Sequence, residues 1–98
     1  MKSVMIVYNQ VMSREVEQML DELDVRGFTR WTDVEGRGST TGKPHLGTHT
    51  WPALNGAILC VIDDERVEAL LDGVRSLDES GRVDRGIRAF VWHVEQMV

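Results

Sequence analysis

Residues 57–77, AILCVIDDERVEALLDGVRSL, predict a strand that leads directly into a helix. The apolar run 57–62 has the length and composition of a buried central strand. Asp63 or Asp64 can cap the helix that follows, and Gly81 lies just past its expected end. Apolar residues recur in between at the spacing of one helix face. They are Val67, Leu70, Leu71, Val74 and Leu77.

The same pattern occurs at the start of the chain. Residues 4–8, VMIVY, predict a buried strand. Ser13 then offers a hydroxyl N-cap, and Gly27 can end the helix that follows. The apolar stripe of this helix consists of Val16, Met19, Leu20 and Leu23.

Two further strands are expected. Residues 28–35, FTRWTDVE, are β-rich in type, but their large apolar side chains recur every third residue, so we expect a bend or bulge. Residues 87–94, IRAFVWHV, predict the last strand. Between them, residues 36–52 are rich in glycine, hold both prolines and show no period, which predicts a long loop.

The order of elements is therefore βαββαβ in a single domain, 1–98. This order contains two strand–helix–strand units, each of which forms a crossover. Two βαβ crossovers predict an α+β, ferredoxin-like fold, in which a four-stranded antiparallel sheet carries both helices on one face. The other face of the sheet then needs cover. Trp31, Trp51 and Trp92 provide more aromatic surface than two helices require, so we expect other copies of the chain to bury that face.

Composition narrows the class of protein. The 98 residues include 11 Lys and Arg against 16 Asp and Glu, and a net charge of −5 argues against nucleic-acid binding. No apolar run approaches the ~20 residues that span a bilayer. Cys60 is the only cysteine, which excludes an intramolecular disulfide and fits a reducing compartment. We expect a small acidic protein of the cytoplasm that is not embedded in a membrane.

Three stretches resemble the P-II nitrogen-regulator family. Residues 25–38, VRGFTRWTDVEGRG, resemble its second strand and the glycine-rich base of its long signalling loop. Residues 61–67, VIDDERV, resemble its third strand and the turn into its second helix. Residues 80–94, SGRVDRGIRAFVWHV, resemble its basic turn and last strand, with one residue inserted. The likeness covers nearly the whole chain.

This resemblance implies a trimer with a ligand site in each cleft between subunits. The expected ligand is small and anionic, an adenine nucleotide in the family. The long loop, 37–52, would act on a regulated partner protein such as a transporter or an enzyme. By the same resemblance, the loop base supplies backbone contacts and the basic turn binds phosphate. The implied nucleotide-binding residues are Gly36, Arg37, Gly38, Arg82, Arg85 and Arg88.

The chain also departs from the family. Thr40 and Thr41 stand where the family has a Gln that binds magnesium and 2-oxoglutarate, followed by a Lys. Tyr8 is the only tyrosine, so the modified loop tyrosine of some members has no counterpart. The family's C-terminal phosphate-binding arginines would lie beyond Val98. The resemblance therefore indicates a divergent member and leaves open whether 2-oxoglutarate is sensed.

Other interpretations stay open from the residues alone. The basic turn can equally be a solvated turn whose arginines pair with nearby acids. His45 and His49 are four residues apart and suit a transition metal, which gives an alternative function as a metal-binding, CutA-like member of the superfamily. A plain interaction module without a ligand is the third possibility. No nucleophile context is recognisable, so we do not expect an enzyme.

Overall fold

The computed structural model describes residues 1–37, 54–79 and 86–98, and their elements follow the predicted order βαββαβ. Two short 3₁₀ helices, η1 and η2, precede the two α-helices. The strands are β1 (Lys2–Asn9), β2 (Thr29–Val34), β3 (Asn55–Ile62) and β4 (Ile87–His93), and the helical elements are η1 (Gln10–Met12), α1 (Ser13–Glu22), η2 (Asp64–Arg66) and α2 (Val67–Glu79).

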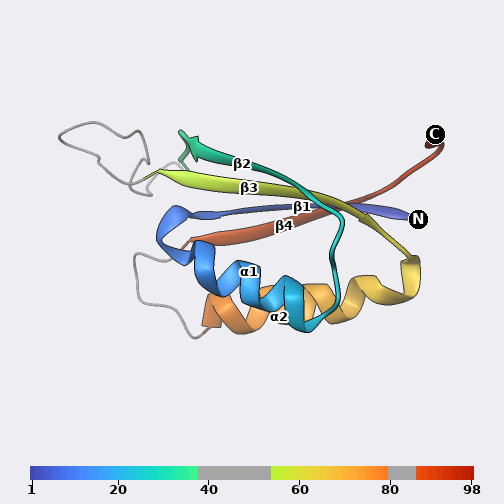
Figure 1. Ribbon diagram of the computed structural model, residues 1–98, viewed down its shortest axis with the longest axis horizontal. Coiled ribbons are helices and arrows are strands. Elements are labelled where there is room, and N and C mark those ends of the chain that lie inside the picture. Colours follow the sequence, from blue (N-terminus) through green and yellow to red (C-terminus); the bar gives the residue numbers. More distant parts are fainter. Residues whose placement is uncertain (38–53, 80–85) are drawn as a thin grey trace.

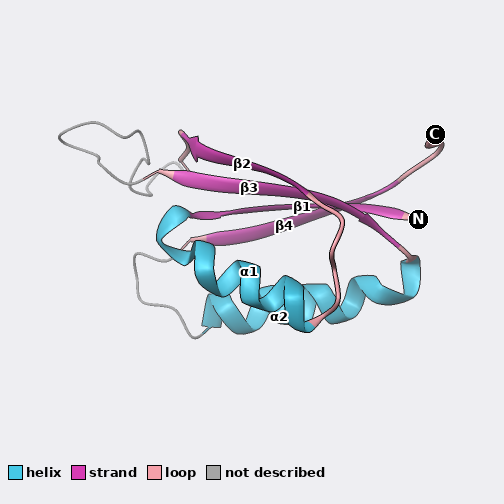
Figure 2. Ribbon diagram, in the orientation of Figure 1, coloured by secondary structure: helices cyan, strands magenta, loops and turns pink. Residues whose placement is uncertain are grey.

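The four strands form one antiparallel sheet in the order β2-β3-β1-β4. The two longest pairings place β1 between β3 and β4, while β2 pairs only with β3 and forms an edge. Both α-helices lie on one face of this sheet (Figures 1 and 2). This arrangement confirms the predicted ferredoxin-like fold.

The core lies between the sheet and the helices. In β1, Val4, Ile6 and Tyr8 point toward the helices and are at most 1% exposed. Because strand side chains alternate, their register partners on β3 and β4 face the same way. The helices contribute the other half of the core, chiefly through Met12, Val16, Leu20, Leu70 and Val74.

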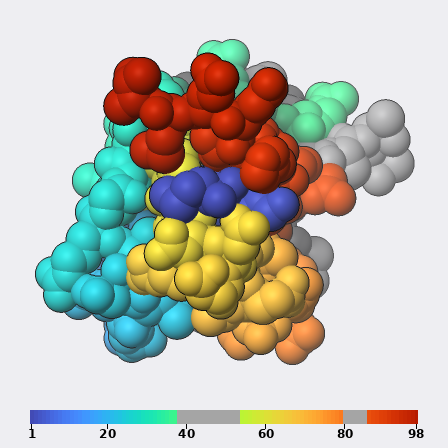
Figure 3. Space-filling view, turned by 90° about the vertical axis from the view of Figure 1, so that its right-hand side faces the viewer, coloured from blue at the N-terminus to red at the C-terminus, as the bar shows by residue number. Residues whose placement is uncertain are grey.

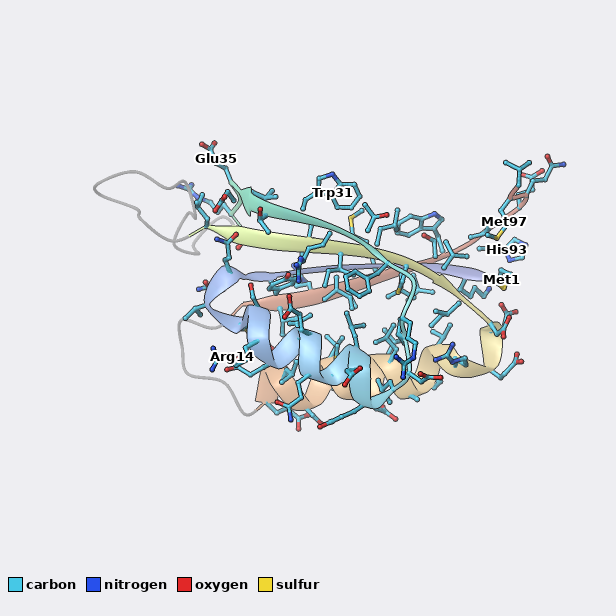
Figure 4. The ribbon with its side chains drawn as sticks, in the orientation of Figure 1. Met1, Arg14, Trp31, Glu35, His93 and Met97 are labelled. Carbon is cyan, nitrogen blue, oxygen red and sulfur yellow. The ribbon has the colours of Figure 1, made fainter. Side chains whose placement is uncertain are left out.

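The opposite face of the sheet is not covered by the described elements. Trp31, Phe90 and Trp92 lie on it and are 45%, 50% and 47% exposed. Figure 4 shows Trp31 projecting from β2 on the side away from the helices. The third tryptophan of the prediction, Trp51, lies outside the described residues. We call this surface the open face.

The bulge expected in the second strand is present. Trp31 pairs with Ala57, but the next register pair joins Val34 to Asn55, so β2 has one residue more than β3 over this interval. Asp33, within the bulge, has a φ of 58°, a left-handed conformation that aspartate tolerates better than most residues.

Both helices begin differently from the prediction. Ser13 is not an N-cap: it is the first residue of α1, and its hydroxyl donates to the Gln10 carbonyl over 2.7 Å. The capping side chain belongs to Asn9, which accepts from the Val11 amide at the start of η1. Asp63 precedes η2, but its side chain makes no capping hydrogen bond. A 3₁₀ turn precedes each α-helix, and its backbone carbonyls accept from the amides that a capping side chain would otherwise satisfy. The expected side-chain caps are therefore not used.

The end of α1 also departs from the prediction that Gly27 stops the helix. The helix ends at Glu22, and Asp24 takes a φ of 56° just after it. Arg66 donates one guanidinium nitrogen to the carbonyls of Leu23 and Asp24, at 2.8 and 2.9 Å. The Arg66 side chain, from η2, therefore satisfies carbonyl groups at the end of α1. Gly81 lies outside the described residues.

The two chain termini lie at the same end of the sheet (Figure 1). The Met1 carbonyl accepts from the Val94 amide, and the Met1 amino group pairs with Asp64 at 2.9 Å. Figure 3 looks onto this end and shows the start of β1 between the β3–α2 turn and the C-terminal residues. Among the described residues, no helix is long and apolar enough to cross a membrane.

Candidate ligand-binding site

The end of the sheet opposite the termini is the candidate site, and we call it the loop end. β1 and β2 finish there, and β3 and β4 begin there (Figure 1). In sequence, residues 38–53 join β2 to β3, and residues 80–85 join α2 to β4. The predicted long loop and basic turn are therefore both attached at this end.

Gly36 sits at the loop end in close contact with β3. A β-carbon on residue 36 would lie 2.6 Å from Asn55 Nδ2, closer than a real β-carbon approaches a neighbouring atom. A side chain at residue 36 would therefore have to displace the Asn55 carboxamide, so glycine is the residue that fits here without moving Asn55. Arg37 follows directly and is exposed.

Arg88 is at the same end but on the other edge of the sheet. It pairs in register with Val7 of β1, and alternation from the buried Ile87 places its side chain on the open face. Arg37 follows the β2 edge, three inter-strand spacings away, or roughly 14 Å. The sheet thus brings Gly36, Arg37 and Arg88 to one end but not to one point. An extended ligand, or the edges of neighbouring chains, is needed to use all three.

A junction that the sequence did not reveal ties the loop end together. The Asn9 amide donates to the Gly86 carbonyl over 2.7 Å, and the Gln10 amide donates to the Leu54 carbonyl over 2.9 Å. The Gln10 side chain donates from Nε2 to Asp33 Oδ1 over 2.9 Å and accepts from the Asp33 amide over 2.6 Å. The last residue of β1 and its neighbour thus contact the ends of all three other strands. In the sequence, only the bulge had a signal, the recurrence of Phe28, Trp31 and Val34 at every third residue.

Several predicted site residues lie outside the described part of the chain. They are Gly38, Arg82, Arg85, His45 and His49, with the loop beyond Arg37. Among the described residues, no group of three or more His, Cys, Asp and Glu side chains could hold a metal ion. His93 lies at the opposite end of the sheet from Glu35, the residue that follows β2 (Figure 4). The described residues therefore give no support to the metal-binding alternative.

Within residues 1–37, 54–79 and 86–98, the titratable groups with shifted pKa values lie away from the loop end. Burial raises the pKa of the Cys60 thiol in the second half of β3, although Arg66 opposes the shift. The hydrogen bond from the Met1 amino group lowers the pKa of Asp64, and the hydrogen bond to Asp24 raises the pKa of Arg26. The loop end is instead marked by guanidinium groups, glycine backbone and side-chain amides, which suit the binding of an anion.

The fold and this site define a ferredoxin-like protein with two loops anchored beside exposed arginines at one end of its sheet. The family model described as "Nitrogen regulatory protein P-II" matches residues 1–98. The chain belongs to the P-II family, whose members are signalling proteins. The resemblance found in the sequence is therefore confirmed. A comparison with curated proteins gives no match.

Solved structures support the fold. CPII, a nitrogen regulatory PII-like protein from Thiomonas intermedia K12 bound to ADP, AMP and bicarbonate, superposes with a TM-score of 0.69 at 19% identity, over 97% of this chain and 88% of that chain. The apo form of CPII gives 0.65 at 17% identity, over 95% and 89%. A putative PII-like signaling protein from Thermus thermophilus gives 0.58 at 19% identity, over 93% and 83%.

Proposed function

We propose that this protein is a P-II-like regulator, without enzymatic activity, that binds an adenine nucleotide at the loop end. The observation that carries the proposal is the placement of Gly36, Arg37 and Arg88 together at that end, beside the attachments of both loops. The structures of CPII with ADP and AMP support the choice of ligand, because a chain of the same family and fold holds these nucleotides.

The proposed contacts follow from the chemistry of phosphate. Guanidinium groups present several donors in a planar array and remain charged at all physiological pH values, which suits phosphate oxygens. Arg37 and Arg88 supply such groups from the described residues, and Arg82 and Arg85 would add to them. The backbone amides of Gly36 and Gly38 would add neutral hydrogen-bond donors to these charged groups.

We further propose that the chain works as a trimer with its ligand sites in the clefts between subunits. The support is the open face, on which Trp31, Phe90 and Trp92 are about half exposed. A patch of large aromatic side chains on one face of a small protein marks an association surface. The separation of Arg37 and Arg88 on opposite edges also fits a cleft that two chains complete.

The long loop, 37–52, would carry the signal to a regulated protein, such as a transporter or an enzyme. A net charge of −5 makes nucleic acid an unsuitable partner. The free Cys60, buried within β3, fits a reducing compartment such as the cytoplasm.

Isothermal titration with ADP, AMP and ATP, each with and without bicarbonate, tests the ligand. We expect Arg88→Ala to weaken nucleotide binding by at least about tenfold, since a lost hydrogen bond to a charged group is worth about 1.5–3 kcal/mol. Arg75→Ala is the matched control, because Arg75 lies on α2 and pairs with Asp72 and Glu68. The double variant His45→Ala with His49→Ala should bind nucleotide as the wild type does. A wild-type protein that binds none of the three at millimolar concentration contradicts the proposal.

A further inference from the structure

We propose that Gln10 is a positioning residue that couples the end of the basic turn to the base of the long loop. Asn9 holds Gly86, the residue at which the chain returns from the turn. Gln10 holds both ends of the long loop, Asp33 through its side chain and Leu54 through its amide. Two consecutive residues therefore join two loops that are far apart in the sequence.

The side-chain contact is specific because both polar atoms of the Gln10 carboxamide are used. Its nitrogen donates to the Asp33 carboxylate, and its oxygen accepts from the Asp33 backbone amide. The bulge interrupts the ladder to β3 between Trp31 and Val34, so Gln10 supplies the acceptor for an amide beside the broken register. Gln10 lies on η1, which follows β1, and β1 does not pair with β2.

The backbone conformation at Asp33 gives this contact a second role. A φ of 58° is unfavourable for a residue with a β-carbon, and such conformations persist where surrounding contacts enforce them. The Gln10 contact reaches Asp33 from outside β2 and β3. Losing it would let residues 32–35 relax, which would redirect the chain as it leaves β2 toward Gly36 and Arg37.

The backbone of Gln10 is itself held firmly. Its carbonyl accepts from the Ser13 hydroxyl over 2.7 Å, and the Asn9 side chain accepts from the Val11 amide over 3.1 Å. These bonds make Asn9 and η1 one rigid unit. A displacement of residue 86 therefore moves Asn9 and Gln10 together, and the Gln10 side chain passes the displacement to Asp33. The role in signalling rests on the proposed function, but the coupling itself does not.

Exchanging the amide and the carboxylate between residues 10 and 33 tests the coupling in the ligand-free protein. Gln10→Glu replaces the donor with a carboxylate that faces the Asp33 carboxylate, so the contact breaks. Asp33→Asn alone keeps an acceptor for Gln10 and tolerates the positive φ. Combining the two changes restores both hydrogen bonds, because the introduced amide at 33 donates to the introduced carboxylate at 10. Gln18→Glu is the control, since Gln18 lies on the exposed side of α1 and its side chain donates to Glu22, far from the junction.

The measurement is amide hydrogen exchange at residues 9 and 33 by NMR, corrected for intrinsic rates. We expect Gln10→Glu to speed exchange at residue 33 by at least about fivefold and at residue 9 by at least about twofold, as losing about one hydrogen bond predicts. The double variant should return both rates to the wild-type values. An unchanged rate at residue 9 in Gln10→Glu, or a failure of the double variant to restore both rates, overturns the coupling.

Adding ADP separates this inference from the proposed function. We expect ADP to change the exchange rate at residue 33 in the wild type and in the double variant, but not in Gln10→Glu. A wild type that binds ADP without any change at residue 33 overturns the role of the coupling in signalling. A wild type that binds no ADP contradicts the proposed function instead, and the ligand-free comparison still decides the coupling.

Discussion

Gly56 packs so closely against Tyr8 that a β-carbon on residue 56 would lie 2.6 Å from Tyr8 Cζ. The two residues are register partners in the pairing of β1 with β3, near the loop end. The tyrosine ring occupies the space that a side chain on β3 would otherwise fill. The packing of the core therefore reaches to within one residue of the Asn9–Gln10 junction.

Gly56→Ala is expected to destabilise the protein, because the added methyl group must displace a ring that is 1% exposed. Overpacking of this kind lowers the free energy of unfolding by about 1–3 kcal/mol. Urea denaturation at fixed protein concentration measures it. Gly27→Ala is the control, since nothing lies within 4 Å of a β-carbon at residue 27. Equal stabilities of the two variants would contradict the close packing.

Tyr8→Phe is expected to stabilise the protein. The Tyr8 hydroxyl is buried and has no hydrogen-bond partner among the described residues. Removing an unsatisfied buried hydroxyl without changing the ring raises the free energy of unfolding by about 1 kcal/mol. The same urea titration checks this, and a less stable variant would show that the hydroxyl has a partner.

Phe90→Asp is expected to prevent association through the open face. Phe90 is 50% exposed there, and an unpaired carboxylate would be costly to bury between subunits. Sedimentation equilibrium at micromolar concentration should give about three chains for the wild type and one for the variant, as a closed cyclic assembly requires. Val11→Asp, at an exposed apolar residue on η1, should leave the assembly intact. A monomeric wild type would refute the association.

The Cys60 thiol is expected to react slowly in the folded protein. Burial raises its pKa above the ordinary value of 9.0, so less thiolate forms at a given pH. A thiol reagent at pH 8 should react at least about tenfold faster in concentrated urea than in buffer. Because the pKa is raised in the folded state, stability should fall as the pH rises through 9.0, and less so in Cys60→Ala. Measuring both proteins in a Tyr8→Phe background removes the phenol. Equal reactivity in urea and buffer would contradict the burial.

The fold followed from the sequence because its signals were local and repeated. The apolar runs at 4–8 and 57–62 and the stripes of the two helices each fixed one element. Even the bulge was visible, because Phe28, Trp31 and Val34 recur every third residue where a regular strand alternates. Helix boundaries were less accurate, since Asn9 and Arg66 satisfy groups that only the folded backbone brings within their reach.

The sequence predicted only some of the residues at the loop end. Gly36, Arg37 and Arg88 could be named from motifs because each lies in a stretch that resembles the family. Gln10 and Asp33 could not, because 23 residues separate them and neither type is distinctive at its position. A contact of that kind depends on strand order, which places β3 between β2, where Asp33 lies, and β1, which Gln10 follows.

The bulge in β2 also bears on how this protein avoids aggregation. β2 is an edge strand, and a regular edge presents a row of unpaired amides and carbonyls to which another strand can add. The left-handed turn at Asp33 interrupts that row and places a negative charge in it. The Asp33 amide already donates to the Gln10 side chain of η1, so it is not available to another strand. An incoming strand would therefore meet an irregular, charged edge, which discourages uncontrolled sheet extension in a molecule that carries a large aromatic patch on one face.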